Sequence, residues 1–96
     1  MEFEPPAENK FTVYSKSGCN NCVKIKNVLK EKNHEYNTVD CDEYIIEEKD
    51  NFLQYIEKLA EKELKTFPIV FFNKKYIGGY KETIDYIEKH LFFDYL

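Results

Sequence analysis

Arginine and tryptophan are absent from this 96-residue chain, and cysteine, glycine and proline occur only three times each. All fourteen positive charges are therefore lysines, which meet an anion as a point charge and not as a two-pronged guanidinium. The net charge is −4, and the lysines are spread along the chain without forming a basic stripe. Such a stripe neutralises phosphates in nucleic-acid-binding proteins, so we expect no nucleic acid as a partner.

Long apolar runs are also missing. No run approaches the roughly 18 to 20 residues that a membrane span needs, and residues 1–10 have neither the basic start nor the apolar core of a signal peptide. The cysteines, Cys19, Cys22 and Cys41, are too few and odd in number for the disulfide framework of a small secreted domain. We therefore expect a soluble protein without a membrane partner, located in the reducing cytoplasm.

Aromatic residues are plentiful, with eight Phe and eight Tyr in a chain that is 43% hydrophobic. A disordered chain of this charge would lack them, so we expect a globular protein. This length is enough for one hydrophobic core and not for two. Residues 1–9 contain Pro5 and Pro6 and no periodic pattern, which predicts a flexible lead-in followed by a single domain over residues 10–96.

Hydrophobic periodicity predicts alternating strands and helices. Asp50 is the expected N-cap of the second helix, and residues 44–49 are either a separate short helix or an extension of it. Ile84, Ile87 and Leu91 fall on the expected inner face of the last helix. The expected elements are strand 11–14, helix 20–32, strand 36–39, helix 50–63, strand 69–72, strand 76–77 and a helix from about residue 81.

The order β-α-β-α-β-β-α predicts an α/β fold. The first helical crossover requires a parallel pair of strands, whereas the short turn at Asn73 requires an antiparallel pair. A four-stranded mixed sheet flanked by three or more helices follows.

Two cysteines separated by two asparagines occupy the turn from the first strand into the first helix. Cys19 is expected at the helix N-terminus, where free N–H groups and the positive end of the helix dipole favour a thiolate. Cys22, one turn later on the apolar side, is expected to be more buried and to keep a higher pKa. We therefore predict Cys19 as a nucleophile and Cys22 as the resolving thiol that attacks a mixed disulfide.

A zinc site is the other use of cysteines at this spacing, with His34 and Cys41 as further ligands. Eleven residues separate Cys22 from His34 and six separate His34 from Cys41, outside the common spacings of a second ligand pair. We expect no metal site, and we expect Cys41 to be a small buried residue.

Four features in the right order resemble a glutaredoxin, a member of the thioredoxin-fold superfamily, from residue 10 to about residue 91. They are Lys16 three residues before Cys19, the Cys19 and Cys22 pair, Thr66-Phe67-Pro68 in the place of the family's T-V-P, and Gly78-Gly79 before the last helix. The resemblance implies a thioredoxin-like fold and a glutathione-disulfide oxidoreductase, or thioltransferase. Such an enzyme reduces protein disulfides and glutathione mixed disulfides, with glutathione as the reductant.

The resemblance also implies a glutathione site. In the family the T-V-P proline is cis and lies against the nucleophilic cysteine, and the residue before it offers backbone groups to the ligand. The implied residues are Lys16 and Lys65 at the glycine carboxylate, Phe67 and Pro68 at the cysteinyl part, and Gly79, Tyr80, Lys81 and Glu82 at the γ-glutamyl part. Lys65 is equally compatible with a solvated surface lysine, and Glu82 with a glutamate that favours the first turn of its own helix.

Asn20 and Asn21 stand where dithiol glutaredoxins commonly have Pro-Tyr. Members without that proline include some that bridge a [2Fe-2S] cluster between two subunits with glutathione, so a cluster-bound dimer is an alternative to the expected monomer. A thioredoxin-like reductase is a second alternative, although thioredoxins carry a Trp beside the first cysteine and this chain has none. The expected partners are glutathione and proteins that carry disulfides or glutathione adducts.

Overall fold

The computed structural model describes residues 1–91, apart from the side chain of Leu91. Four strands form one sheet in the spatial order β2-β1-β3-β4. β1 is parallel to β2 and antiparallel to β3, and β4 is antiparallel to β3, which confirms the predicted mixed sheet. The strands are β1 (Phe11–Ser15), β2 (Tyr36–Asp40), β3 (Ile69–Phe72) and β4 (Lys75–Gly78).

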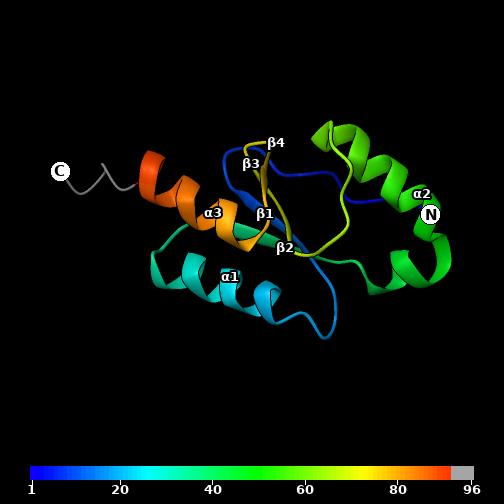
Figure 1. Ribbon diagram of the computed structural model, residues 1–96, viewed down its shortest axis with the longest axis horizontal. Helices are drawn as coiled ribbons and strands as arrows, with labels where there is room; N and C mark the ends of the chain where they lie inside the picture. Colours follow the sequence, from blue (N-terminus) through cyan, green and yellow to red (C-terminus); the bar gives the residue numbers. More distant parts are fainter. Residues whose placement is uncertain (92–96) are drawn as a thin grey trace.

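Helices cover both faces of the sheet (Figure 1). They are α1 (Asn20–Glu31), α2 (Asp42–Ala60) and α3 (Tyr80–Tyr86), which continues as a π-helical segment over Ile87–Leu91. On the face of α1 and α3, the buried residues are Phe11, Val13, Ile25, Leu29, Val70 and Ile87. On the face of α2, they are Tyr14, Val39, Cys41, Phe52, Ile56, Leu64, Ile69 and Phe71. None of the helices within residues 1–91 is both long and apolar enough to cross a membrane.

The central strand β1 is buried along its whole length because its side chains alternate between the two covered faces. Phe11 and Val13 pack under α1 and α3, whereas Tyr14 packs under α2. In the parallel pairing, Ser15 at the end of β1 lies opposite Asp40 at the end of β2. The segments that follow these two strands therefore start side by side, and one of them carries the cysteine pair.

The start of α2 differs from the prediction of an N-cap at Asp50. The helix begins at Asp42, and residues 44–49 form its first half, joined to the second half across a kink at Glu48 (φ −142°, ψ 43°). Tyr44 and Ile45 pack against the core on one side of the kink, as Phe52 and Ile56 do on the other. The kink brings two apolar stripes onto one sheet face, which explains why the periodicity seemed to restart at residue 50.

Residues 1–9, which the sequence predicts as a flexible lead-in, contact the rest of the fold at several points. The Phe3 ring packs edge-on against Tyr44 and Phe52. The Tyr14 hydroxyl donates to the Glu4 carbonyl at 2.7 Å, and the Glu4 N–H donates to the Tyr44 hydroxyl at 3.1 Å. The segment thus lies over the α2 side of the core.

The last helix begins at Tyr80, one residue before the prediction, with Gly79 as its N-cap. Ile87 is buried and Ile84 packs against the same cluster, which confirms their predicted inner positions. The prediction for the Leu91 side chain lies outside the described residues.

Candidate active site

The two cysteines of the C-x-x-C motif form a disulfide at the start of α1. Cys19 is the N-cap of the helix, and its sulfur accepts the Cys22 N–H at 3.2 Å. Cys19 is partly exposed, whereas Cys22 is only 1% exposed. The predicted placement is confirmed: Cys19 is at the helix start and partly exposed, and Cys22, one turn later, is buried.

The segment that enters α1, residues 16–18, forms what we call the redox loop. Gly18 has a φ of +73°, a left-handed conformation in which a side chain would be strained although there is room for one. Ser17 donates to the Asp42 carboxylate twice, from its N–H at 2.8 Å and from its hydroxyl. These hydrogen bonds lower the pKa of Asp42, and the nearby Lys16 ammonium adds to the effect.

The Thr66-Phe67-Pro68 segment lies next to this loop. The Phe67–Pro68 peptide bond is cis, as the family resemblance implied. The Lys16 ammonium lies 5.8 Å from the centre of the Phe67 ring, within the range of a cation–π contact. A methyl group placed on Gly79 would lie 3.6 Å from the Pro68 carbonyl oxygen, so the two motifs that carry these residues are neighbours in space.

Most of the residues implied by the resemblance line one of three hollows, of which the second shares Lys16 with the first and Lys65 with the third. A hollow of about 340 Å³ contains Lys16 and both redox cysteines. A second of about 400 Å³ contains Lys16, Lys65 and Phe67, and a third of about 320 Å³ contains Lys65, Pro68, Gly79 and Glu82. Tyr80 instead packs against the core, and Lys81 is exposed.

Glu82 already has a hydrogen-bond donor. Its carboxylate accepts the Gly79 N–H at 3.0 Å and thereby caps the first turn of α3. Lys65 forms an ion pair with Glu63 at 3.9 Å, but both side chains are more than 70% exposed. An exposed pair of this length holds neither group firmly, so Lys65 can turn toward another anion.

Cys41 takes no part in this arrangement. It is fully buried at the end of β2, and burial, together with the negative charge of Asp40, raises the pKa of its thiol to about 12. His34 lies at the other end of the molecule, with its ring 5.8 Å from that of Phe11. Within residues 1–91, no three His, Cys, Asp or Glu side chains gather in a way that could hold a metal ion.

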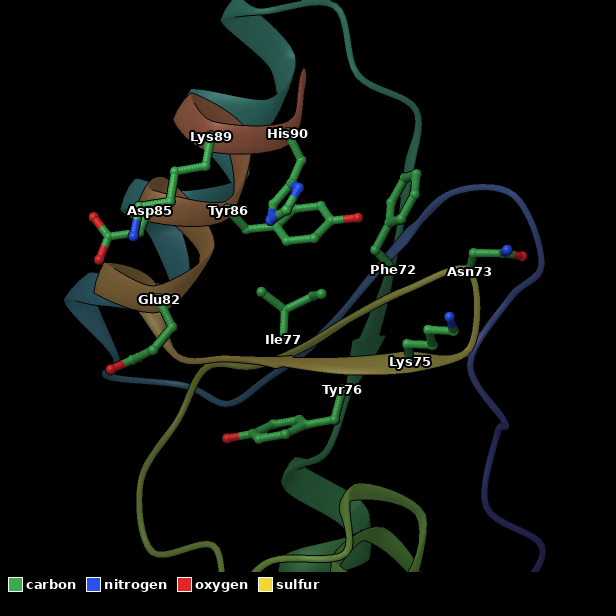
Figure 2. A pocket seen from close by; sticks show the side chains of 10 residues that line it. All are labelled: Phe72, Asn73, Lys75, Tyr76, Ile77, Glu82, Asp85, Tyr86, Lys89 and His90. Atoms are coloured by element: carbon green, nitrogen blue, oxygen red, sulfur yellow. The ribbon is translucent and has the colours of Figure 1, made fainter. Parts of the chain in front are cut away.

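A further hollow, of about 520 Å³, includes neither redox cysteine. Figure 2 shows it between β4 and the last helix, with Ile77 pointing toward the rings of Tyr86 and His90. Glu82 and Asp85 lie at its edge, whereas Tyr76 points to the opposite side of the strand. This hollow is separate from the one that the cysteines line.

Sequence reasoning missed the contact between Ser17 and Asp42, which are 25 positions apart. A signal for it is present in retrospect. Both residues come two positions after the ends of paired parallel strands, since Ser15 and Asp40 lie opposite each other. The contact therefore becomes visible only once the register of β1 and β2 is known.

Comparisons with known proteins agree with this arrangement. The glutaredoxin family model matches residues 11–77. Glutaredoxin 1 of Rickettsia conorii is 34% identical over 73 residues, which are 76% of this chain and 67% of that protein. The structure of glutaredoxin 1 from Francisella tularensis complexed with cacodylate superimposes with a TM-score of 0.74 at 25% identity, over 85% of this chain and 95% of that one.

A buckwheat glutaredoxin, solved as a glutathione complex, has the same fold, with a TM-score of 0.64 at 23% identity over 83% of this chain and 69% of that one. The predicted thioredoxin-like α/β class is thereby confirmed. The match to the family model covers both central strands and the cysteine pair, and the match to the relative extends over three quarters of the sequence. This chain belongs to the glutaredoxin family.

Proposed function

We propose that this chain is a glutathione-dependent thiol-disulfide oxidoreductase that reduces protein disulfides and glutathione mixed disulfides. Family membership and the C-x-x-C pair make it a thiol oxidoreductase. The observation that carries the finer proposal is the Cys19–Cys22 disulfide at the start of α1, in which Cys19 is partly exposed and Cys22 is buried. We also propose that it acts as a monomer in the cytoplasm, where glutathione keeps thiols reduced.

The proposed cycle starts from the reduced pair. The Cys19 thiolate attacks one sulfur of the target disulfide, so the target's S–S bond breaks and a mixed disulfide with Cys19 forms. The Cys22 thiol then loses its proton to solvent and attacks the Cys19 sulfur, which releases the reduced target and leaves the Cys19–Cys22 disulfide. Two molecules of glutathione restore both thiols and leave as glutathione disulfide.

The helix start favours the first of these steps. The Cys22 N–H points at the Cys19 sulfur from 3.2 Å, and a donor in this place stabilises a thiolate more than a neutral thiol. We therefore expect the pKa of Cys19 to lie below the value of about 8.5 for a free thiol. Burial acts in the opposite direction on Cys22, which keeps its proton until the mixed disulfide has formed.

Glutathione carries two carboxylates and one ammonium, and we propose that each of these groups has a binding partner in this site. Lys16 and Lys65 would meet the glycine carboxylate, and the backbone of Phe67, beside Pro68, would meet the cysteinyl part. At the other end, N–H groups at Gly79, Tyr80 and Lys81 would meet the γ-glutamyl carboxylate, and Glu82 would meet the ammonium. The glutathione complex of the buckwheat relative and the presence of most of these residues in the lining of three hollows support this assignment.

A [2Fe-2S] cluster would require a different assembly. Of the three cysteines, all within the described residues, only Cys19 is partly exposed, since Cys22 and Cys41 are buried. Four sulfur ligands would therefore have to come from Cys19 of two copies and from two glutathione molecules. Absorbance in the visible range after anaerobic purification identifies this assembly, because a dithiol protein is colourless.

The decisive assay measures reduction of a glutathionylated protein by glutathione and glutathione reductase, against thioredoxin reductase as the alternative supply of electrons. Cys19→Ser should abolish turnover, whereas Cys22→Ser should keep deglutathionylation, because glutathione can replace the second thiol. Cys41→Ala serves as the control, since its thiol is buried away from the site. Equal loss in the first two variants would contradict the single-thiol route, and turnover with thioredoxin reductase alone would contradict glutathione dependence.

A further inference from the structure

One carboxylate, that of Asp42, holds the redox loop from outside. Its Oδ1 accepts the Ser17 N–H at 2.8 Å, and its Oδ2 accepts the Ser17 hydroxyl. The two hydrogen bonds engage both oxygens and involve a backbone and a side-chain donor of one residue. Ser17 is two residues before Cys19, so its backbone position affects where the nucleophilic sulfur lies.

Asp42 is itself attached to a rigid part of the fold. The Cys41 N–H donates to the Ser15 carbonyl at 2.8 Å, which extends the parallel pairing of β1 and β2 by one residue. The Asp42 N–H donates to the Asp40 carboxylate at 3.0 Å, and Asp42 is the first residue of α2. The carboxylate therefore starts from a backbone that is fixed by the sheet edge and by a helix.

Asp42 also changes the charge balance around the reacting sulfur. The hollow that contains Cys19 is lined by Lys16 from the redox loop, Lys26 from α1 and Asp40 from β2. Lys16 favours a thiolate at Cys19, but it also faces Asp42, whose pKa it helps to lower. A second negative charge beside Asp40 offsets part of the positive potential at the sulfur.

We propose that Asp42 is a positioning residue of the redox centre, which holds the loop through Ser17 and limits how strongly Lys16 acidifies Cys19. The proposal rests on Cys19 as the reacting thiol, and it does not require glutathione as the reductant. It separates into a geometric part, carried by the two hydrogen bonds, and an electrostatic part, carried by the charge.

Three substitutions distinguish the two parts. Asp42→Asn removes the charge but keeps an oxygen for the Ser17 N–H and an amide group for its hydroxyl. Asp42→Ala removes both the charge and the two hydrogen bonds to Ser17. Ser17→Ala removes the hydrogen bond of the hydroxyl while the charge stays. Glu43→Gln is the matched control, because Glu43 is the next residue, is exposed and has no hydrogen bond or ion pair within the described part of the chain.

The measurements use reduced protein in a Cys22→Ser background, where Cys19 is the accessible thiol. Its alkylation by iodoacetamide against pH gives the pKa, and amide hydrogen exchange at Ser17 reports the hold on the loop. One charge removed close to the exposed redox loop is worth less than about 1 kcal/mol, so at low ionic strength both Asp42 variants should lower the midpoint by about half a pH unit. Asp42→Ala alone should also speed Ser17 exchange by about fivefold.

Three outcomes would overturn the proposal. If Glu43→Gln moves the midpoint as far as Asp42→Asn does, the shift comes from the loss of any nearby negative charge and not from the position of Asp42. If Asp42→Ala leaves Ser17 exchange unchanged, the loop is held by other contacts. If Ser17→Ala moves the midpoint as much as Asp42→Asn does, the two parts are not separable. Because no glutathione is present, these results are independent of the outcome of the turnover assay.

Discussion

Replacing Phe3 by alanine tests whether residues 1–9 belong to the folded core. Its ring centre lies 5.0 Å from that of Tyr44, 5.4 Å from that of Phe52 and 5.3 Å from that of Tyr55. Three aromatic neighbours from α2 therefore enclose one side of the ring, and Phe3 is the residue of this segment that packs against the buried cluster. Alanine would remove the ring and its contacts with these three neighbours.

The expected cost follows from the burial of this ring. A fully buried Phe→Ala substitution costs about 3–5 kcal/mol, and Phe3 is only half-buried, so we expect a loss of about 2 kcal/mol in the free energy of unfolding. For a chain of this size, that loss corresponds to a decrease of about 10 °C in Tm. Urea unfolding of the oxidised protein, followed by tyrosine fluorescence or circular dichroism, measures it directly.

Glu2→Ala is the control for this experiment, because Glu2 is exposed and adjacent to Phe3 in the chain. It should change the free energy of unfolding by less than about 0.5 kcal/mol. If Phe3→Ala changes stability by no more than this control, the segment is a loosely attached lead-in, as the sequence predicted, and the packing onto α2 contributes nothing.

Three further predictions concern charge. Folding raises the pKa of Cys41 to about 12, so unfolding releases a proton above about pH 9 and the free energy of unfolding should fall as pH rises. By pH 10 the decrease should be about 1.4 kcal/mol larger than in Cys41→Ala. Urea unfolding of a variant whose redox cysteines are Ser measures this difference. Lys16→Glu and Lys65→Glu should each raise the KM for glutathione several-fold, and Lys16→Glu should do more, because it also places a negative charge beside the Cys19 thiolate; if neither KM moves, the glutathione site is misassigned. Glu82→Ala should lower stability by about 1 kcal/mol through loss of its cap on Gly79, as thermal unfolding would reveal, and unchanged stability would contradict that capping role.

Regular periodicity accounts for the elements that could be predicted. The helix over residues 20–31 buries Cys22, Ile25 and Leu29 along one stripe, and the run 69–72 is buried as its continuous apolar character indicated. The sequence left open whether residues 44–49 extend the second helix, as they do in the structure, because the kink at Glu48 changes the phase of the apolar stripe. A pattern search that assumes one straight helix assigns residues on the two sides of such a kink to different elements.

The contacts of residues 1–9 could not be predicted for a different reason. Two prolines and four polar or charged residues among nine give no periodic signal, and one isolated phenylalanine does not indicate what it packs against. Its partners, Tyr44 and Phe52, lie on α2 and come together only after the helix has packed on the sheet. The contact is therefore a property of the tertiary fold and not of the segment.

The contacts in the candidate site are likewise of two kinds, local ones and ones that depend on the tertiary fold. The placement of Cys19 at a helix start and the cap between Gly79 and Glu82 involve residues at most three positions apart, so local rules suffice to anticipate them. The contact of Ser17 with Asp42 depends on which residue of β2 lies opposite Ser15. A shift of that register by one residue would turn β2 over, exposing Val39 and moving the Asp42 carboxylate away from the redox loop. The buried side chain of Val39 thus selects the register that places a negative charge beside the loop of the nucleophile, which connects core packing directly to the chemistry of the cysteine pair.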